Sequence, residues 1–131
     1  MKLIQSNVVE LAANAVRTST LTTTGVDVAA YDGPCHLILQ SSAATAGTTP
    51  TLNVKLQHSD ASGSGFADVT GVAFSEVTDA DLTEMLTVQI GDLKRYVRLV
   101  GTIAGTDTPT FGFGVVMVGN LQSGRNASQS I

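Results

Sequence analysis

The chain has 131 residues and a mass of 13.5 kDa, which suits one domain and is too short for two independently packed cores. Only 14% of the residues are charged and 5% are aromatic, whereas seventeen are threonine and 13 are glycine. This composition favours strands and turns, excludes a coiled coil, and with 43% hydrophobic residues argues against a disordered chain. The net charge of −4 repels phosphate backbones, so nucleic acid is not an expected partner.

Residues 1–18 are predicted to be an N-terminal arm that is either helical or extended. Asn7, Glu10 and Asn14 interrupt its apolar residues, so it does not have the pattern of a signal peptide. Its apolar content predicts docking on its own core or on a neighbouring subunit. Nowhere does an apolar stretch approach the roughly 20 residues that a membrane span requires, so no membrane partner is expected.

Residues 19–119 are predicted to form one β-sandwich domain, because apolar and polar residues alternate with a period of two. In one segment Leu52 and Val54 fall on one side while Asn53 and Lys55 fall on the other. The predicted strands are residues 21–30, 36–41, 51–58, 82–90, 94–104 and 110–119. Turn-like sequences, including residues 105–109, separate them, which indicates an antiparallel sandwich or barrel.

Two details of these strands lead to specific expectations. Glu84 falls in an apolar row, so strand pairing in residues 82–90 is expected to begin only near Met85. Gly112 and Gly114 alternate along the last strand, where they would let another backbone approach closely. Residues 120–131 are polar and rich in turn formers, and they are predicted to be a C-terminal tail.

The sequence offers few candidates for catalysis. Cys35 is the single cysteine and is adjacent to His36, so on a strand the two side chains face opposite sides of the sheet. His58, Ser59 and Asp60 are hydrolase residue types, yet consecutive residues do not form a triad. We therefore predict a protein that is not an enzyme and has no catalytic residues. A small hydrolase or lyase is the minority hypothesis, and it would need His36 and His58 to converge as metal ligands.

A metal or cofactor site is not predicted either. The acidic residues Glu76, Asp79, Asp81 and Glu84 invite a calcium hypothesis, but their spacing does not match a calcium-binding loop. A solvated acidic loop is the preferred interpretation. No glycine loop for phosphate, paired-cysteine metal site or dinucleotide fingerprint occurs.

Lys94, Arg95 and Arg98 form the one local basic cluster, which a strand divides between two faces. The preferred interpretation is an internal strand whose arginines pair with Asp or Glu at the sandwich edge. The alternative is that Arg and Tyr96 contribute to a protein interface, where both residue types are enriched.

Three stretches together resemble the small cement or decoration proteins of tailed bacteriophage heads. They are residues 25–33 (GVDVAAYDG), residues 56–60 (LQHSD) leading into 65–69 (GFADV), and residues 92–99 (DLKRYVRL). The resemblance covers about residues 20 to 119, and it is the order and spacing of the stretches that make it specific.

The resemblance implies an all-β, jelly-roll sandwich, to which the sequence itself adds an N-terminal arm, expected to be extended in this fold, and a short polar C-terminal tail. It also implies self-association, with a homodimer ahead of a homotrimer, and docking on the major capsid protein at the outer capsid surface of a virion made in the host cytoplasm. The scarcity of charge agrees with such a role, because burying unpaired charge in an interface is expensive. The alternative function is a carbohydrate-binding β-sandwich of a phage fibre or surface protein. Such sites usually present flat aromatic side chains to the sugar. This chain has no tryptophan, and its only tyrosines are Tyr31 and Tyr96.

Overall fold

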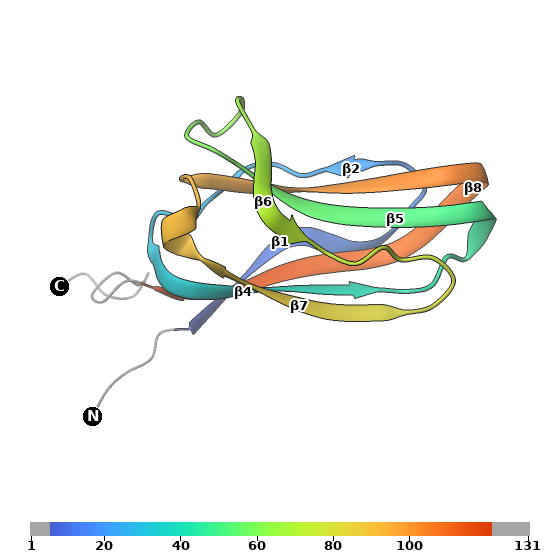
Figure 1. Cartoon of the computed structure of the whole chain (residues 1–131), viewed down its shortest axis with the longest axis horizontal. Coiled ribbons are helices and arrows are strands. Elements are labelled where there is room, and N and C mark those ends of the chain that lie inside the picture. The colour runs from blue at the N-terminus through green and yellow to red at the C-terminus, as the bar shows by residue number, and fades with distance from the viewer. Residues whose placement is uncertain (1–5, 122–131) are drawn as a thin grey trace.

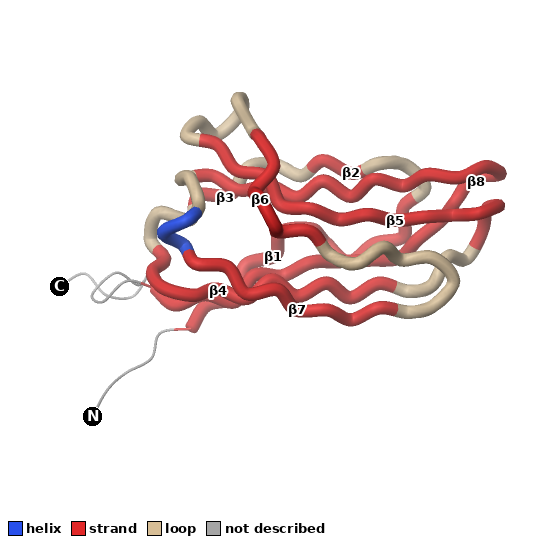
Figure 2. Tube along the Cα trace, in the orientation of Figure 1, coloured by secondary structure: helices blue, strands red, loops and turns tan. Residues whose placement is uncertain are grey.

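The computed structural model describes residues 6–121, and they form an antiparallel all-β sandwich, which confirms the predicted fold class (Figures 1 and 2). The strands are β1 (Ser6–Arg17), β2 (Leu21–Thr22), β3 (Val26–Asp27), β4 (Tyr31–Ser41), β5 (Ala46–Ser59), β6 (Ala67–Ala73), β7 (Leu82–Gln89) and β8 (Tyr96–Leu121). One short 3-10 turn, η1 (Ile90–Asp92), connects β7 to β8. None of the described residues form a helix that is long and apolar enough to cross a membrane.

The long strand β8 belongs to both layers of the sandwich. Its first half pairs with β5 on one side and with the short strands β2 and β3 on the other, and β6 extends this sheet beyond β5. Its second half pairs with β1 and β4, and β7 extends that sheet beyond β4. We call the β1-β8-β4-β7 layer sheet A, and the layer containing β2, β3, β8, β5 and β6 sheet B.

Residues 105–109, predicted as a turn between two separate strands, are instead a bend within one continuous strand. Figure 1 shows β8 running along one layer, bending at the end of the sandwich and returning along the other. The backbone adopts positive φ at Gly105, Asp107 and Thr108, and β5 stays paired with β8 at Thr48 opposite Thr106. The prediction of two strands was wrong because the pairing with β5 continues through the bend.

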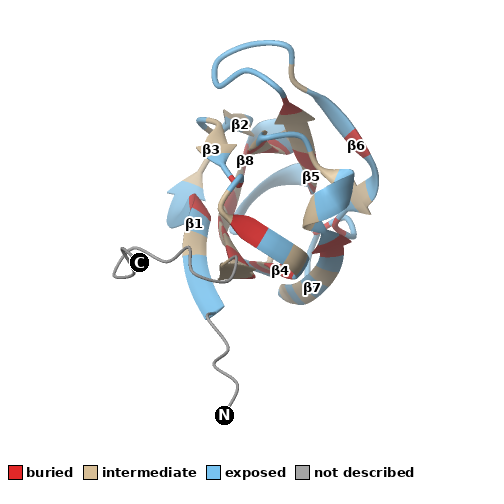
Figure 3. Cartoon of the chain, turned by 90° about the vertical axis from the view of Figure 1, so that its left-hand side faces the viewer, coloured by how far each residue is buried: buried red, intermediate tan, exposed pale blue. Residues whose placement is uncertain are grey.

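The core lies between the layers and is built from the inward rows of the strands (Figure 3). In the second half of β8 every second side chain is buried, as the alternation predicted. The fully buried side chains from the two layers include Leu37, Leu39, Phe111, Phe113 and Met117 of sheet A and Leu52, Leu56, Val97 and Leu99 of sheet B. Packing of this kind makes large-to-small substitutions in either layer costly.

The question left open for the N-terminal arm has a clear answer in the described part, because Ser6–Arg17 is an extended strand rather than a helix. It pairs with β8 of its own chain from Ser6 opposite Asn120 to Arg17 opposite Phe111, and it buries Leu11 and Ala12 in the core. Two register shifts interrupt the pairing. The Arg17 guanidinium donates hydrogen bonds to the carbonyls of Ala13, Ala15 and Phe113, and so stabilises the irregular region.

The start of β7 and the predicted C-terminal tail both differ from the sequence predictions. Pairing of β7 with β4 begins at Leu82, not near Met85, because the Glu84 carboxylate accepts hydrogen bonds of 2.8 Å from both the backbone N–H and the hydroxyl of Ser75. That satisfies the charge in an otherwise apolar row. Of the predicted tail, residues 120 and 121 end β8, while residues 122–131 lie outside the described part of the chain.

Candidate interaction surface

The side chains of sheet A that point away from the core form a surface that we call face A. Because directly opposed residues of an antiparallel pair lie on the same side of the sheet, the strand register arranges them in rows across β1, β8, β4 and β7. One row is Val8, Val118, His36 and Thr87, and the next is Glu10, Val116, Ile38 and Met85. Two of the four side chains in the first row and three of the four in the second are apolar.

Face A also collects the exposed large apolar side chains of the described chain. Val8, Val16 and Met85 are 63%, 73% and 57% exposed, and they come from the two outer strands of the sheet. Residues 6–121 have no other large apolar side chain in this exposure class. Contiguous apolar surface on a soluble protein marks a site of interaction, whereas single exposed residues need no explanation.

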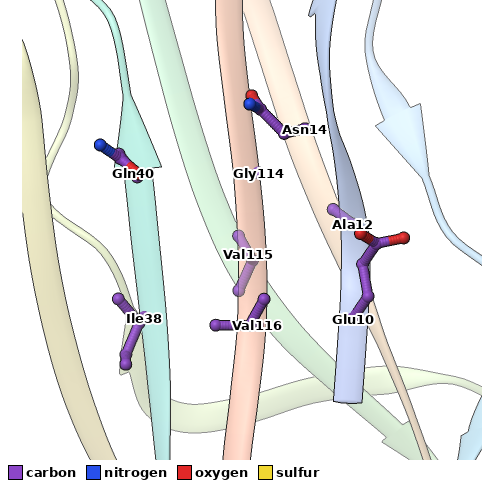
Figure 4. Close-up of a pocket in the computed structure, with 8 residues that line it drawn as sticks. All are labelled: Glu10, Ala12, Asn14, Ile38, Gln40, Gly114, Val115 and Val116. Carbon is purple, nitrogen blue, oxygen red and sulfur yellow. The ribbon is translucent and has the colours of Figure 1, made fainter. Parts of the chain in front are cut away.

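A shallow groove runs along face A between β1 and β4, with β8 as its floor (Figure 4). Glu10 and Asn14 line it from β1, Ile38 and Gln40 line it from β4, and Gly114 lies between them. A second hollow adjoins this groove, because Asn14 and Gln40 line both of them. That hollow is also lined by Val16, Ser42, Asp81, Thr83 and Gly112.

The two glycines of β8 explain how close the strands lie. A Cβ at Gly114 would stand 2.9 Å from the Cα of Asn14, whereas a Cβ at Gly112 would meet the Ser42 hydroxyl at 3.4 Å. The sequence predicted that these glycines permit a close backbone approach, and at Gly114 the approaching backbone is β1 of the same chain. Gly112 and Gly114, which we call the glycine floor, therefore line the two hollows, and Gly114 also lets β1 pack close to β8.

Several polar side chains of face A are left without partners inside the described structure. Among residues 6–121, the Glu10 carboxylate, the Asn14 and Gln40 amides and the Thr83 hydroxyl form no side-chain hydrogen bond. His36 does, because its Nδ1 lies 3.0 Å from the Thr87 hydroxyl. Face A thus combines exposed aliphatic groups with donors and acceptors that are available to a partner.

The outer surface of sheet B, which we call face B, is different. Lys55 forms a 3.0 Å ion pair with Asp68, Gln57 donates to the same carboxylate at 2.8 Å, and Arg98 donates to Gln57 at 2.9 Å. Hydrogen bonds from Gln57 and Lys55 lower the pKa of Asp68. The charges of face B are therefore already engaged with one another.

The basic cluster follows the preferred interpretation in part. Arg95 forms a 2.9 Å ion pair with Asp27, and hydrogen bonds from Arg95 and from the Ala29 N–H lower the pKa of that carboxyl. Arg98 does not pair with an acid, since it binds the Gln57 amide and lies over the Phe66 ring at 4.2 Å. These contacts hold the arginines within the sheet B layer.

The candidate catalytic residues do not converge. Cys35 is fully buried, and its burial raises the pKa of the thiol, while His36 lies on the opposite side of β4. His58 accepts a hydrogen bond of 3.1 Å from the Lys94 N–H, and Ser59 donates to the Ser64 carbonyl. His36 is in sheet A and His58 is in sheet B, so the metal pair required by the minority hypothesis does not form.

The four acidic residues considered for a calcium site each accept a hydrogen bond from a different residue. Glu76 accepts from Asn53, Asp79 from Thr78, Asp81 from the Ala43 N–H and Glu84 from Ser75. Within residues 6–121, no group of three or more metal-ligating side chains occurs. These carboxylates therefore satisfy local backbone and side-chain donors.

The two tyrosines are poorly placed to serve as sugar platforms. Tyr31 is buried, and its hydroxyl accepts a 2.6 Å hydrogen bond from Asn7. Tyr96 is half-buried, and the Arg95 guanidinium lies 5.3 Å from its ring centre. Neither ring presents an open aromatic face of the kind that a glycan site uses.

Comparison with known proteins identifies the fold. No protein-family model and no curated protein matches the sequence. Among solved structures, a chain of the T13 infectious bursal disease virus particle matches with a TM-score of 0.59 and 14% identity over 96% of this chain. The VP2 subviral particle of the same virus matches with a TM-score of 0.54 and 11% identity over 92% of this chain. The present chain spans about a third of those viral chains, 33% in both cases.

A third similar structure has nearly the same length as this chain. The SPBc2 prophage-derived protein YomS matches with a TM-score of 0.52 and 11% identity, covering 92% of this chain and 96% of its own. At such low identity these similarities concern the fold alone. The sandwich described above is therefore an all-β fold that is shared with viral capsid proteins and with a prophage protein.

Proposed function

We propose that this chain is a structural virion protein, a cement or decoration protein that binds the outside of the major capsid protein lattice of a tailed bacteriophage and stabilises the head. The observation that supports this most directly is face A, where Val8, Val16 and Met85 are exposed on one side of sheet A. A protein that must cover a neighbouring surface needs such an apolar area.

The charges of face A favour docking on another protein. In the two central rows, Glu10 is the only carboxylate among mainly aliphatic side chains. Burying this face therefore desolvates little charge, and the free Asn14 and Gln40 amides can satisfy backbone groups of the partner. Burying face B instead would remove water from the charged Lys55 and Asp68, and that desolvation is costly.

The stabilising effect would come from many weak contacts. A ligand that binds the assembled shell but not the disrupted one raises shell stability by mass action, and many copies on a closed lattice add their contributions. This role is non-enzymatic and asks for no cofactor. The similarity of the fold to virus-particle proteins and to a prophage-derived protein is consistent with it.

Heating capsids with and without the purified protein tests the proposal. At saturating occupancy we expect a higher temperature of capsid disruption, measured by scanning calorimetry or by release of packaged DNA. Electron cryomicroscopy of the same particles should show face A against the capsid surface. Identical disruption temperatures at full occupancy would contradict the cement role, and contact through face B would contradict the assignment of the surface.

A further inference from the structure

The four free edges of the two sheets differ in how well they are protected from pairing with another strand. On sheet A, β1 has two register shifts. On sheet B, β6 has a register shift and a positive φ of 77° at Gly71, while β2 and β3 have only two residues each. Bulges and short strands are the devices by which proteins protect sheet edges.

Strand β7, the other edge of sheet A, has none of these irregularities. Its eight residues pair with β4 without a register shift, from Leu82 opposite Ser41 to Gln89 opposite Pro34. Within the described chain β7 pairs with no strand other than β4, so its outer backbone edge is not part of a sheet ladder. A regular edge of this length, about 27 Å, is a template for strand pairing.

The outward side chains of β7 carry no charge that would oppose self-pairing. The outward row contains Thr83, Met85, Thr87 and Gln89, none of which is charged. The one ionisable residue of the strand, Glu84, points inward and is held by Ser75. Self-pairing through β7 therefore brings no unpartnered charge to the new contact.

We propose that the β7 edges of two copies of this chain pair antiparallel about a two-fold axis and form a homodimer. Residues that face each other in an antiparallel pair lie on the same side of the sheet, so the axis passes through a residue of the strand. An axis at Met85 places Thr83 opposite Thr87 and Glu84 opposite Leu86. An axis at Glu84 would place two carboxylates opposite each other, which is unfavourable.

The pairing makes the four strands of each sheet A into one continuous sheet across the dimer. The two-fold axis of an antiparallel pair is perpendicular to the sheet, so both copies of face A point the same way. The exposed Met85 side chains meet at the centre of the combined surface. If the proposed function is correct, the dimer presents a doubled docking area, but the dimer itself does not depend on that function.

Sedimentation velocity of the purified chain over a wide concentration range tests the dimer without any capsid present. We expect a monomer–dimer equilibrium for the wild type. Met85→Lys places two ammonium groups opposite each other at the axis and should raise the dimer dissociation constant by about tenfold or more. The matched control is Val16→Lys, an exposed position on the protected edge of the same sheet, and it should leave the constant unchanged.

Cross-linking provides a second readout that does not depend on weakening the dimer. Under mild oxidation Met85→Cys should give a covalent dimer and Val16→Cys should not, while the buried Cys35 stays unreactive in both. A wild-type chain that remains monomeric at all concentrations overturns the proposal. So does a Met85→Lys variant that dimerises as well as the wild type, or a dimer that Val16→Lys disrupts.

Discussion

The two outer faces of the sandwich are built by the same strand and yet have opposite chemistry. On face B, Arg98 of β8 binds Gln57, which in turn shares Asp68 with Lys55. On face A, β8 contributes glycines and valines, and the polar groups of the neighbouring Asn14 and Gln40 have no partner among the described residues. The charged groups of face B bind partners within the face, whereas the Asn14 and Gln40 amides of face A bind none among residues 6–121.

Low charge and availability for binding are therefore separate properties of a surface. The whole chain is poor in charge. On face B the ionic groups form local hydrogen bonds and ion pairs, which lower the pKa values of Asp27 and Asp68. Because exposed ion pairs contribute little to stability, this network adds little to the stability of the fold. Face A is the side on which burial against a partner removes apolar surface from water.

The largest expected effect concerns binding. Val8→Asp adds a carboxylate to the β1 side of face A, beside Val118, at a position that is 63% exposed, so folding should be unaffected. Burying the added charge should weaken binding to capsids by about tenfold or more. The control is Thr102→Asp, which adds the same charge to an exposed position of β8 on face B and should leave binding unchanged. Co-sedimentation with capsids measures both, and equal losses would contradict the distinction between the faces.

The next effect concerns the glycine floor of face A. Gly114→Ala puts a Cβ 2.9 Å from the Asn14 backbone and should destabilise the fold by about 1–3 kcal/mol, because β1 must move. Gly112→Ala, two residues away on the same face, meets the Ser42 hydroxyl at 3.4 Å and Val16 Cγ2 at 3.7 Å, which are ordinary contacts with side chains, and should cost much less. Urea unfolding followed by circular dichroism compares them. Equal midpoints for the two variants would show that β1 does not constrain Gly114.

The smallest effect is the pH dependence of face B. Hydrogen bonds from Arg95 and the Ala29 N–H lower the pKa of Asp27, and hydrogen bonds from Gln57 and Lys55 lower that of Asp68. A lowered folded-state pKa stabilises the fold above the unfolded value of 3.8, and this stabilisation is lost as the pH falls through the folded-state values. The melting temperature should therefore fall between about pH 5 and pH 2.

The contribution of these two carboxyls can be isolated by substitution. The double variant Asp27→Asn, Asp68→Asn should melt slightly below the wild type at neutral pH and approach it in acid. High salt should shrink the neutral-pH difference, because both ion pairs are exposed. A constant difference across the whole pH range would mean that the carboxylate charge is not what these residues contribute.

The sequence predicted the fold class and most of the core because alternation is local. Leu52, Val54 and Leu56 are buried as their period required, and so are Phe111 and Phe113. The pattern failed where the strand itself is irregular. Register shifts after Glu10 and Ala12 hide the period of β1, and the positive-φ Gly71 interrupts the short β6, so neither was predicted as a strand.

The candidate surface could be predicted only in part for a different reason. The period of β8 indicates which side of the strand Val116 and Val118 occupy, and the alternating glycines correctly suggested a close backbone approach. The period of β8 does not indicate that Val8 lies beside Val118, or that Met85 lies in the row of Val116. Those neighbours are distant in sequence, and strand register alone brings them together.

Local patterns in the sequence predict an all-β chain with inward apolar rows, few charges and no local arrangement of catalytic residues. How the remaining side chains are divided between face A and face B depends on the folded arrangement of the strands. Because β8 bends at residues 105–109 and changes layer, its arginine-bearing half lies beside Lys55 and its glycine-valine half lies beside β1. Pairing partners across a sheet are set by register over long sequence separations, and no local pattern encodes them.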